Sequence, residues 1–304
     1  MLRRLYIPAL ALLLTTTGAV AQDLVAPTEA LTPAEQQKLF RLPPGFEIQL
    51  VAAEPDVHKP MNLRFDAQGR MWVTQSLEYP FPAADDAPHR DYVGILDQFD
   101  AQGRAQKFTK FVTGLNIPIG LLPIDGGALC YSIPEICFYP DRNGDDAADA
   151  KVVRYSSFGF RDTHGMSSSY TPWIDGWIYA CHGFANTSEV KGADGQPVVM
   201  QSGNTYRMRA DGSHIEYFTH GQVNPFGLAF DPLGHLYSAD CHTLPMYQLL
   251  RGAWYPSFGK PHDGLGFGPT MLSHLHGSTG IAGVVYYAAE QFPPEYRDTV
   301  FIGN

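Results

Sequence analysis

A short pattern built around a tight turn recurs four times along this chain. Each copy contains an aspartate, then a turn glycine, then an apolar residue two positions after that glycine. The turn glycines are Gly69, Gly127, Gly176 and Gly234, so successive copies lie 58, 49 and 58 residues apart. Repeats of this length indicate an array of similar supersecondary units or a propeller.

Each copy is typical of a β-hairpin. The segment Gly221–Tyr237 is the clearest example, because an apolar strand, the turn Asp231–Gly234 and a second strand follow one another. No copy shows the 3.6-residue periodicity of a helix, which excludes a helical solenoid. We therefore predict an all-β β-propeller in which hairpin-based units pack radially.

The stretch from Pro43 to Asn304 has room for about five such blades. We see no leftover strand that would close the ring. The propeller is therefore expected to be incomplete in this chain.

The N-terminus has the features of a secretory signal peptide. A basic start, Met1–Arg4, is followed by an apolar run, Leu5–Leu14, and by the small residues Ala19–Ala21. The run is too short to span a bilayer, so we predict that residues 1–21 are removed and that the protein is periplasmic or secreted. A membrane anchor retained at the N-terminus is the alternative.

Residues 22–42 are expected to form a polar lead and a short helix. Thr32 and Glu35 are spaced as a capping box around Pro33, which predicts a helix that runs to about Phe40. The propeller domain is then predicted over residues 43–304.

The charge balance limits the partners that the protein can have. The chain has 31 acidic and 21 basic residues and a net charge of −10. This argues against a nucleic-acid binder, which needs a basic face. Small neutral or cationic ligands suit such a chain better, and no other segment could cross a membrane.

Four cysteines would face an oxidising compartment after export. Cys130 and Cys137 flank an expected hairpin turn and could pair across its strands, whereas Cys181 and Cys241 end equivalent strands of consecutive repeats. Burial as free thiols is the alternative. The chain contains no C-x-x-C-H motif, so it carries no attached c-type haem.

Candidate site residues follow from the propeller geometry. Equivalent positions on the innermost strands converge on the central channel, so polar corners next to these strands meet there. We predict that the channel is lined by residues at four such positions: His164, Asn224, Asp240 and His276. Singly, each of them could also be a turn former or a polar rim residue.

His164 is the strongest of these candidates. A neutral imidazole can take the proton of a hydroxyl group, which is the first requirement for oxidising an alcohol. Arg161 and Asp162 lie just upstream and could tune its basicity.

Two segments could bind metal ions. Asp141, Asn143, Asp145 and Asp149 place oxygen ligands at alternate positions, as in the first part of a calcium loop, although a solvated acidic turn explains them equally well. The histidines His262, His274 and His276 could bind a transition metal, or they could simply be polar residues of the rim.

Several motifs resemble the soluble PQQ-dependent glucose and sorbosone dehydrogenases. The matching segments are His164 with Asp175–Tyr179, Asn224–Asp231, Ala282–Tyr287 and Phe292–Arg297. From about residue 40 to 304, the chain is also similar to exported proteins of planctomycete-type bacteria that are described as membrane-bound dehydrogenases. The segments typical of them are Ser238–Thr243 and Tyr255–Asp263.

This resemblance implies that the β-propeller is six-bladed, and it implies a cofactor and roles for several residues. Pyrroloquinoline quinone (PQQ) would lie over the channel, Ca²⁺ would polarise its reactive carbonyl, and a histidine would deprotonate the sugar. His164 matches that base and Asn224 matches an asparagine that contacts the cofactor. Val223 stands where the family has an arginine. A sugar or alcohol substrate, and an electron acceptor such as a cytochrome c domain, are the partners that this implies.

Three hypotheses of function result. The first is an exported quinoprotein-like dehydrogenase that oxidises a sugar or alcohol hydroxyl. The second is a non-catalytic propeller that binds carbohydrate or a partner protein. The third, a metal-dependent hydrolase or lactonase, would need acidic ligands at corners that hold mostly asparagine, and it ranks last.

Overall fold

A computed structural model describes residues 28–241, 246–257, 266–267 and 280–303. The chain divides into two compact units, one that ends at Phe40 and one that begins at Arg41. The predicted signal peptide lies outside the described residues. Within the described residues, no helix combines the length and the apolar character needed to span a membrane.

The first unit contains one short helix, α1 (Pro33–Gln37). The Thr32 side chain accepts a hydrogen bond from the Glu35 backbone, and the Glu35 carboxylate accepts one from the Thr32 backbone. The capping box is therefore confirmed, but α1 ends before the predicted Phe40. None of its residues is buried, so no packing extends the helix beyond the turn that the cap stabilises.

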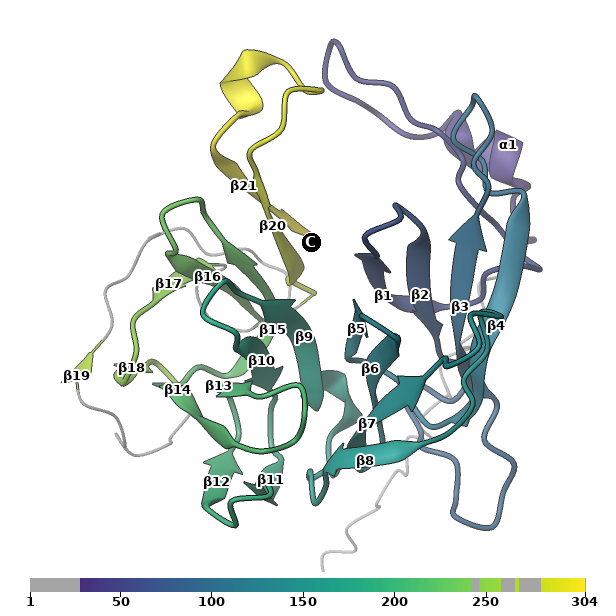
Figure 1. Ribbon diagram of the computed structural model, residues 1–304. Coiled ribbons are helices and arrows are strands. Elements are labelled where there is room, and N and C mark those ends of the chain that lie inside the picture. The colour runs from purple at the N-terminus through teal and green to yellow at the C-terminus, as the bar shows by residue number, and fades with distance from the viewer. Residues whose placement is uncertain (1–27, 242–245, 258–265, 268–279, 304) are drawn as a thin grey trace, which may run out of the picture. The chain divides into compact units, whose positions relative to one another are not determined.

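The second unit consists mainly of antiparallel sheets, and four of them form blades (Figure 1). The first blade is β1 (Pro60–Phe65), β2 (Met71–Gln75), β3 (Asp91–Asp97) and β4 (Lys107–Leu115). The second is β5 (Leu121–Ile124), β6 (Gly127–Ser132), β7 (Glu135–Pro140) and β8 (Val152–Tyr155). The third is β9 (Ser167–Pro172), β10 (Ile178–His182), β13 (Asn204–Met208) and β14 (Ile215–Gly221). The fourth is β15 (Asn224–Phe230), β16 (Leu236–Cys241) and β17 (Met246–Leu249).

The remaining elements extend these blades or follow them. β11 (Thr187–Lys191) and β12 (Pro197–Gln201) form a hairpin between β10 and β13, and η1 (Thr163–Gly165) precedes β9. β18 (Ala253–Tyr255) and β19 (Gly266–Phe267) add two parallel strands beyond β14. β20 (Ala282–Tyr287) and β21 (Thr299–Gly303) form a two-stranded sheet, with η2 (Pro294–Tyr296) between them.

The first strand of each blade is its innermost strand. β1 contacts β5, β5 contacts β9, β9 contacts β15, and β15 contacts β20. Figure 1 shows these strands lying next to one another, with the later strands of each blade farther from the centre. This radial order confirms the all-β propeller prediction, and the four predicted turn glycines all lie at or next to the turn between the first two strands of a blade. A total of six blades stays a prediction.

Apolar clusters between the blades hold them together. Trp72 and Phe111 of the first blade pack with Leu121 and Tyr139 of the second, and Tyr131 of the second packs with Tyr170 of the third. Burying a large apolar side chain contributes about 1.5–3 kcal/mol relative to leaving it exposed. These interfaces therefore carry much of the stability of the fold.

One glycine sets the distance between the last two innermost strands. Gly227 has a φ of +107° at a register shift between β15 and β16. A Cβ atom built on it would lie 2.7 Å from the backbone nitrogen of Val284 in β20. The repeated segment that holds Gly227 therefore needs this glycine for β20 to pack closely on β15.

The four cysteines are buried free thiols. Burial raises the pKa of the Cys137 and Cys241 thiols to about 11, so both are protonated at neutral pH. Cys130 and Cys137 lie opposite each other on β6 and β7, within an apolar cluster. Of the two alternatives for these residues, the structure has free, buried thiols.

Candidate functional site

A pocket of about 640 Å³ lies at the N-terminal ends of the innermost strands. Every blade and the β20–β21 sheet contribute to its wall. The contributing residues are Pro60, Met61, Tyr79, Ile119, Asp162, Thr163, His164, Phe184, Asn224, Phe226, Cys241, Gly280 and Ala282. Positions far apart in the sequence thus converge because each innermost strand begins at the same end of the propeller.

His164 lies on the wall of this pocket in η1, just before β9. The Asp162 carboxylate lies 2.7 Å from His164 Nδ1 and also accepts a hydrogen bond of 2.9 Å from the His164 backbone nitrogen. With the proton on Nδ1 and shared with Asp162, Nε2 keeps its lone pair. The His164 side chain is 63% exposed, so a ligand in the pocket can reach it.

The backbone around His164 is held on several sides. The backbone nitrogen of Asp162 donates to the side-chain oxygen of the buried Asn186, and the Asn186 amide nitrogen donates to the Asp162 carbonyl. The Thr163 hydroxyl donates to the carbonyl of Pro80 in the first blade, and a Cβ atom on Gly183 would lie only 1.5 Å from the Gly165 carbonyl oxygen. The backbone that carries the imidazole of His164 is therefore held in place by hydrogen bonds and close packing.

Tyr79 faces the His164 ring from the first blade. The two ring centroids are 5.7 Å apart, and the rings meet edge to face. Burial, followed by the negative charge of Asp162, raises the pKa of the Tyr79 phenol. Tyr79 therefore stays a neutral hydroxyl beside the base at physiological pH.

Asn224 lines the same pocket, but its amide is already used by the protein. Its Oδ1 accepts a hydrogen bond from the Phe184 backbone at 3.0 Å, and its Nδ2 donates to the His164 carbonyl at 3.4 Å. The structure thus places Asn224 and His164 on the same pocket wall. The Asn224 amide holds the segment that carries His164, and a role of Asn224 in cofactor binding stays a prediction.

Asp240 lies behind the pocket wall rather than on it. It is fully buried at the end of β16, and its carboxylate accepts hydrogen bonds from the backbone nitrogens of Val223 and Asn224, at 3.1 and 2.8 Å. Asp240 therefore fixes the start of β15, which carries Asn224. His276, together with His262 and His274, lies outside the described residues.

The predicted calcium loop lies between β7 and β8, away from the channel pocket. Its side-chain oxygens accept hydrogen bonds from backbone nitrogens of the loop itself: Asp141 from residues 144, 145 and 146, Asn143 from 145, Asp145 from 147, and Asp149 from 142. Within the described ranges, no group of three His, Cys, Asp or Glu side chains is arranged to hold a metal ion. Calcium binding by Asp141, Asn143, Asp145 and Asp149 stays a prediction.

Sequence reasoning missed Asn186 and Tyr79, and it gave Thr163 no role of its own. Asn186 and Thr163 clamp the histidine segment through partners 24 and 83 residues away in the sequence. No local pattern signals such contacts. Asp162 was accessible to sequence reasoning because it lies two residues from the histidine that it orients.

Solved structures share this fold. The chain is similar to an oxidoreductase from Thermus thermophilus described as a glucose dehydrogenase, with 13% identity, a TM-score of 0.50, and 79% of this chain and 76% of that chain covered. It is also similar to the PQQ-bound aldose sugar dehydrogenase from Streptomyces coelicolor, with 15% identity, a TM-score of 0.51, and 79% and 74% covered. At these identities the likeness shows the fold.

Curated proteins give no match to this sequence. A family model described as a domain of unknown function, DUF7133, matches residues 32–304, which is nearly the whole chain. The chain therefore belongs to the DUF7133 family.

Proposed function

We propose that this protein is an exported, quinoprotein-like dehydrogenase that oxidises a hydroxyl group of a sugar or alcohol. The observation that carries the proposal is the pair of His164 and Asp162 on the wall of the channel pocket. The pocket is large enough for a small sugar, and the aromatic rings of Tyr79, Phe184 and Phe226 on its wall suit the apolar faces of one.

The reaction step assigned to this chain is the removal of a proton. A substrate hydroxyl within hydrogen-bond reach of His164 Nε2 gives its proton to that nitrogen. The hydride on the same carbon would leave to a two-electron acceptor of the quinone class, supplied from outside this chain, and the C–O bond becomes a carbonyl. The imidazolium that forms lies beside the Asp162 carboxylate, which stabilises the positive charge. Tyr79 stays neutral and can donate a hydrogen bond to the substrate oxygen.

The described wall of the pocket does not fit PQQ by itself. PQQ carries several carboxylates, whereas none of the described lining residues is Lys or Arg, and Asp162 adds a negative charge. Val223, at the position of the family's arginine, is fully buried. We therefore assign no step to PQQ or to Ca²⁺, and a cytochrome c domain as electron acceptor stays a proposal.

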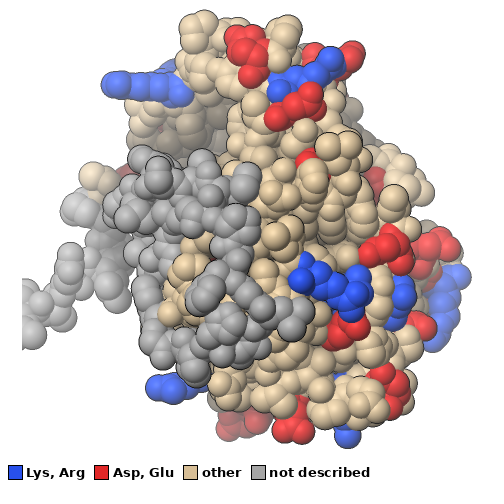
Figure 2. Space-filling view, turned by 90° about the vertical axis from the view of Figure 1, so that its left-hand side faces the viewer, with Lys and Arg blue, Asp and Glu red and all other residues tan. Residues whose placement is uncertain are grey.

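The lack of a cation on the described wall favours a second candidate function. A non-catalytic propeller that binds a neutral carbohydrate needs neither a cofactor nor a base. On the surface shown in Figure 2, acidic and basic side chains are interspersed, and no extended basic patch is seen among the described residues. This agrees with a small-molecule ligand rather than a nucleic acid.

Reconstitution distinguishes the two functions. The purified protein, produced from its full-length gene and secreted from its host, is mixed with PQQ and Ca²⁺, and dye reduction is followed across a panel of sugars and alcohols. The dehydrogenase proposal expects substrate-dependent reduction that saturates only at high PQQ concentration, because the described wall offers no cation. Sugar binding without reduction would favour the non-catalytic propeller.

Asn224→Ala is expected to lower kcat by roughly tenfold, because the His164 carbonyl loses its donor and the base is less well held. Steady-state kinetics in the reconstituted assay measure this change. The matched control is Asn62→Ala, on the innermost strand of the first blade. Its amide donates to the neighbouring Met61 carbonyl, and it is not among the described lining residues of the pocket. An unchanged kcat in Asn224→Ala would contradict the positioning role.

A further inference from the structure

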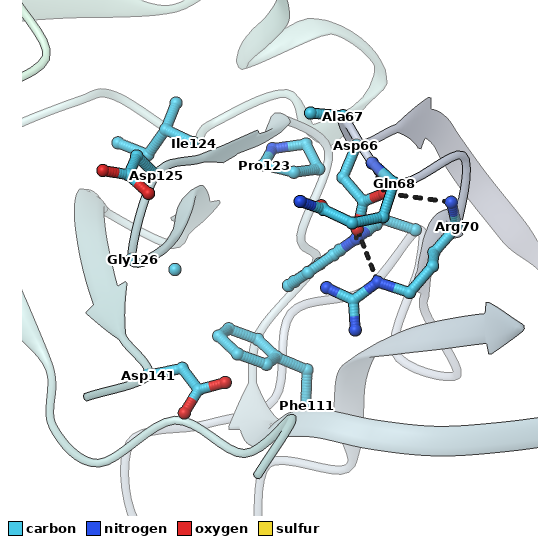
Figure 3. A pocket seen from close by; sticks show the side chains of 12 residues that line it. Asp66, Ala67, Gln68, Arg70, Phe111, Pro123, Ile124, Asp125, Gly126 and Asp141 are labelled. Atoms are coloured by element: carbon cyan, nitrogen blue, oxygen red, sulfur yellow. Dashed lines mark hydrogen bonds and ion pairs between the residues drawn. The ribbon is translucent and has the colours of Figure 1, made fainter. Parts of the chain in front are cut away.

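A second cavity, of about 470 Å³, lies between the first two blades, where the β1–β2 and β5–β6 turns meet (Figure 3). β1 begins at Pro60 in the channel pocket and ends at Phe65, next to this cavity. At about 3.3 Å per residue, the two sites are separated by roughly 17 Å along the strand. The inter-blade cavity is therefore distinct from the candidate active site.

Arg70 is fixed at this cavity by two carboxylates. Its Nε donates to Asp66 at 2.7 Å and its Nη1 donates to Asp146, which also binds Lys107 at 3.0 Å. Asp66 in turn accepts a hydrogen bond of 2.8 Å from the indole of Trp72. The network leaves Arg70 Nη2 without a hydrogen-bond partner among the described residues. The ion pairs of Nε and Nη1 hold the guanidinium group in place at the cavity.

The same five residues occur twice in this chain, in two different settings. Asp-Ala-Gln-Gly-Arg forms residues 66–70 and again residues 100–104. Both copies make the same turn, in which the aspartate accepts from the glutamine and arginine backbone nitrogens at 2.9–3.0 Å. Among the described residues, however, Arg104 forms no ion pair, and its turn borders a space of only about 80 Å³. The inter-blade cavity, rather than the turn, makes the first copy distinctive.

The walls combine apolar surface with groups that donate and accept hydrogen bonds. Trp72 and Phe111 meet edge to face at 4.7 Å and form one wall with Pro123. Figure 3 shows the side chains of Gln68 and Arg70 extending toward the centre from one side and the Asp141 carboxylate facing them from the other. Asp125 also lines the cavity and forms no hydrogen bond or ion pair within the described part of the chain.

These groups favour a neutral ligand with many hydroxyls. An anion would meet Asp66, Asp125 and Asp141, and a cation would meet the guanidinium of Arg70. A hydroxyl group both donates and accepts, so a polyol can satisfy the Gln68 amide, the Arg70 guanidinium and the Asp125 carboxylate without adding charge. Its apolar ring faces can pack on Phe111 and Pro123.

We propose that the inter-blade cavity is a second saccharide-binding site, which holds a neutral sugar through Gln68, Arg70 and Asp125. The site does not depend on the dehydrogenase proposal, because none of its residues lines the channel pocket. A saccharide bound in this cavity would hold the protein on that molecule and leave the channel pocket open to substrate.

Isothermal titration with three neutral disaccharides, maltose, cellobiose and lactose, tests the site. Gln68→Ala is expected to weaken binding of at least one of them by roughly tenfold, the effect of one lost hydrogen bond to a polar ligand. Gln102→Ala, the same change in the second copy of the pentapeptide, should leave binding at the wild-type level. Asp125→Asn is a second variant at an exposed position, and thermal melts verify that all three variants are folded.

The proposal is overturned if no disaccharide binds the wild-type protein at millimolar concentrations, or if Gln68→Ala and Asp125→Asn both bind as tightly as wild type. It is also overturned if spermidine, a cationic probe, binds at this cavity and the sugars do not. A His164→Gln variant that still binds sugar in a Gln68-dependent way would separate this site from the channel pocket.

Discussion

Replacing His164 by glutamine is expected to lower turnover of a sugar or alcohol by roughly 10²–10⁴-fold, the usual contribution of a positioned general base. Glutamine keeps a polar side chain of similar reach but cannot accept the hydroxyl proton. The side chain is 63% exposed, so the free energy of unfolding should change little. Steady-state kinetics of reconstituted protein, with chemical denaturation alongside, measure both quantities.

His235 provides a matched control for this experiment. Its Nδ1 lies 2.8 Å from the Asp231 carboxylate and its side chain is 47% exposed, so it repeats the His164–Asp162 pairing in the β15–β16 turn, away from the channel pocket. His235→Gln should keep full turnover. If His164→Gln also keeps it, His164 has no part in the mechanism.

The largest loss of stability is expected for Asp91→Ala, which should cost about 3–5 kcal/mol. Asp91 is fully buried at the start of β3. Its carboxylate accepts hydrogen bonds from the Ser76 hydroxyl at 2.7 Å and from the backbone nitrogens of Leu77, Glu78 and Ile117, at 2.6, 3.1 and 2.8 Å. Alanine would leave these donors unpaired where the first blade meets the second.

Urea denaturation of Asp91→Ala and of Asp97→Ala tests this expectation. Asp97 ends the same strand, and its carboxylate accepts a hydrogen bond from the neighbouring Gln98 nitrogen. Its removal should cost less than about 1 kcal/mol. Equal losses of stability in the two variants would show that the buried carboxylate does not join the blades.

The fold could be predicted because its signals are local and repeated. The turn glycines, such as Gly69 and Gly234, mark tight hairpins wherever they occur, and radial packing follows from the repeat of the hairpins. Helix α1 was predicted too long, because a capping box fixes where a helix starts and not where it ends. The number of blades in a complete ring is not readable from such local signals.

The candidate site could be predicted only in part. His164 and Asp162 are near neighbours in the sequence, so their pairing was within reach. Asp240 was expected to line the channel, but its buried carboxylate anchors the β15 backbone, and only three-dimensional packing decides between these two uses. The two copies of Asp-Ala-Gln-Gly-Arg show the same limit, because identical residues form an ion-pair network only where the loop that carries Asp146 approaches.

The central claim is that the starts of the innermost strands form one substrate pocket around His164. A crystal structure of the protein with a bound sugar tests it most directly. The account predicts a sugar hydroxyl oxygen within about 2.6–3.2 Å of His164 Nε2, with the sugar also contacting the wall around Asn224. A sugar that is bound elsewhere on the propeller, with the channel pocket empty, would contradict it.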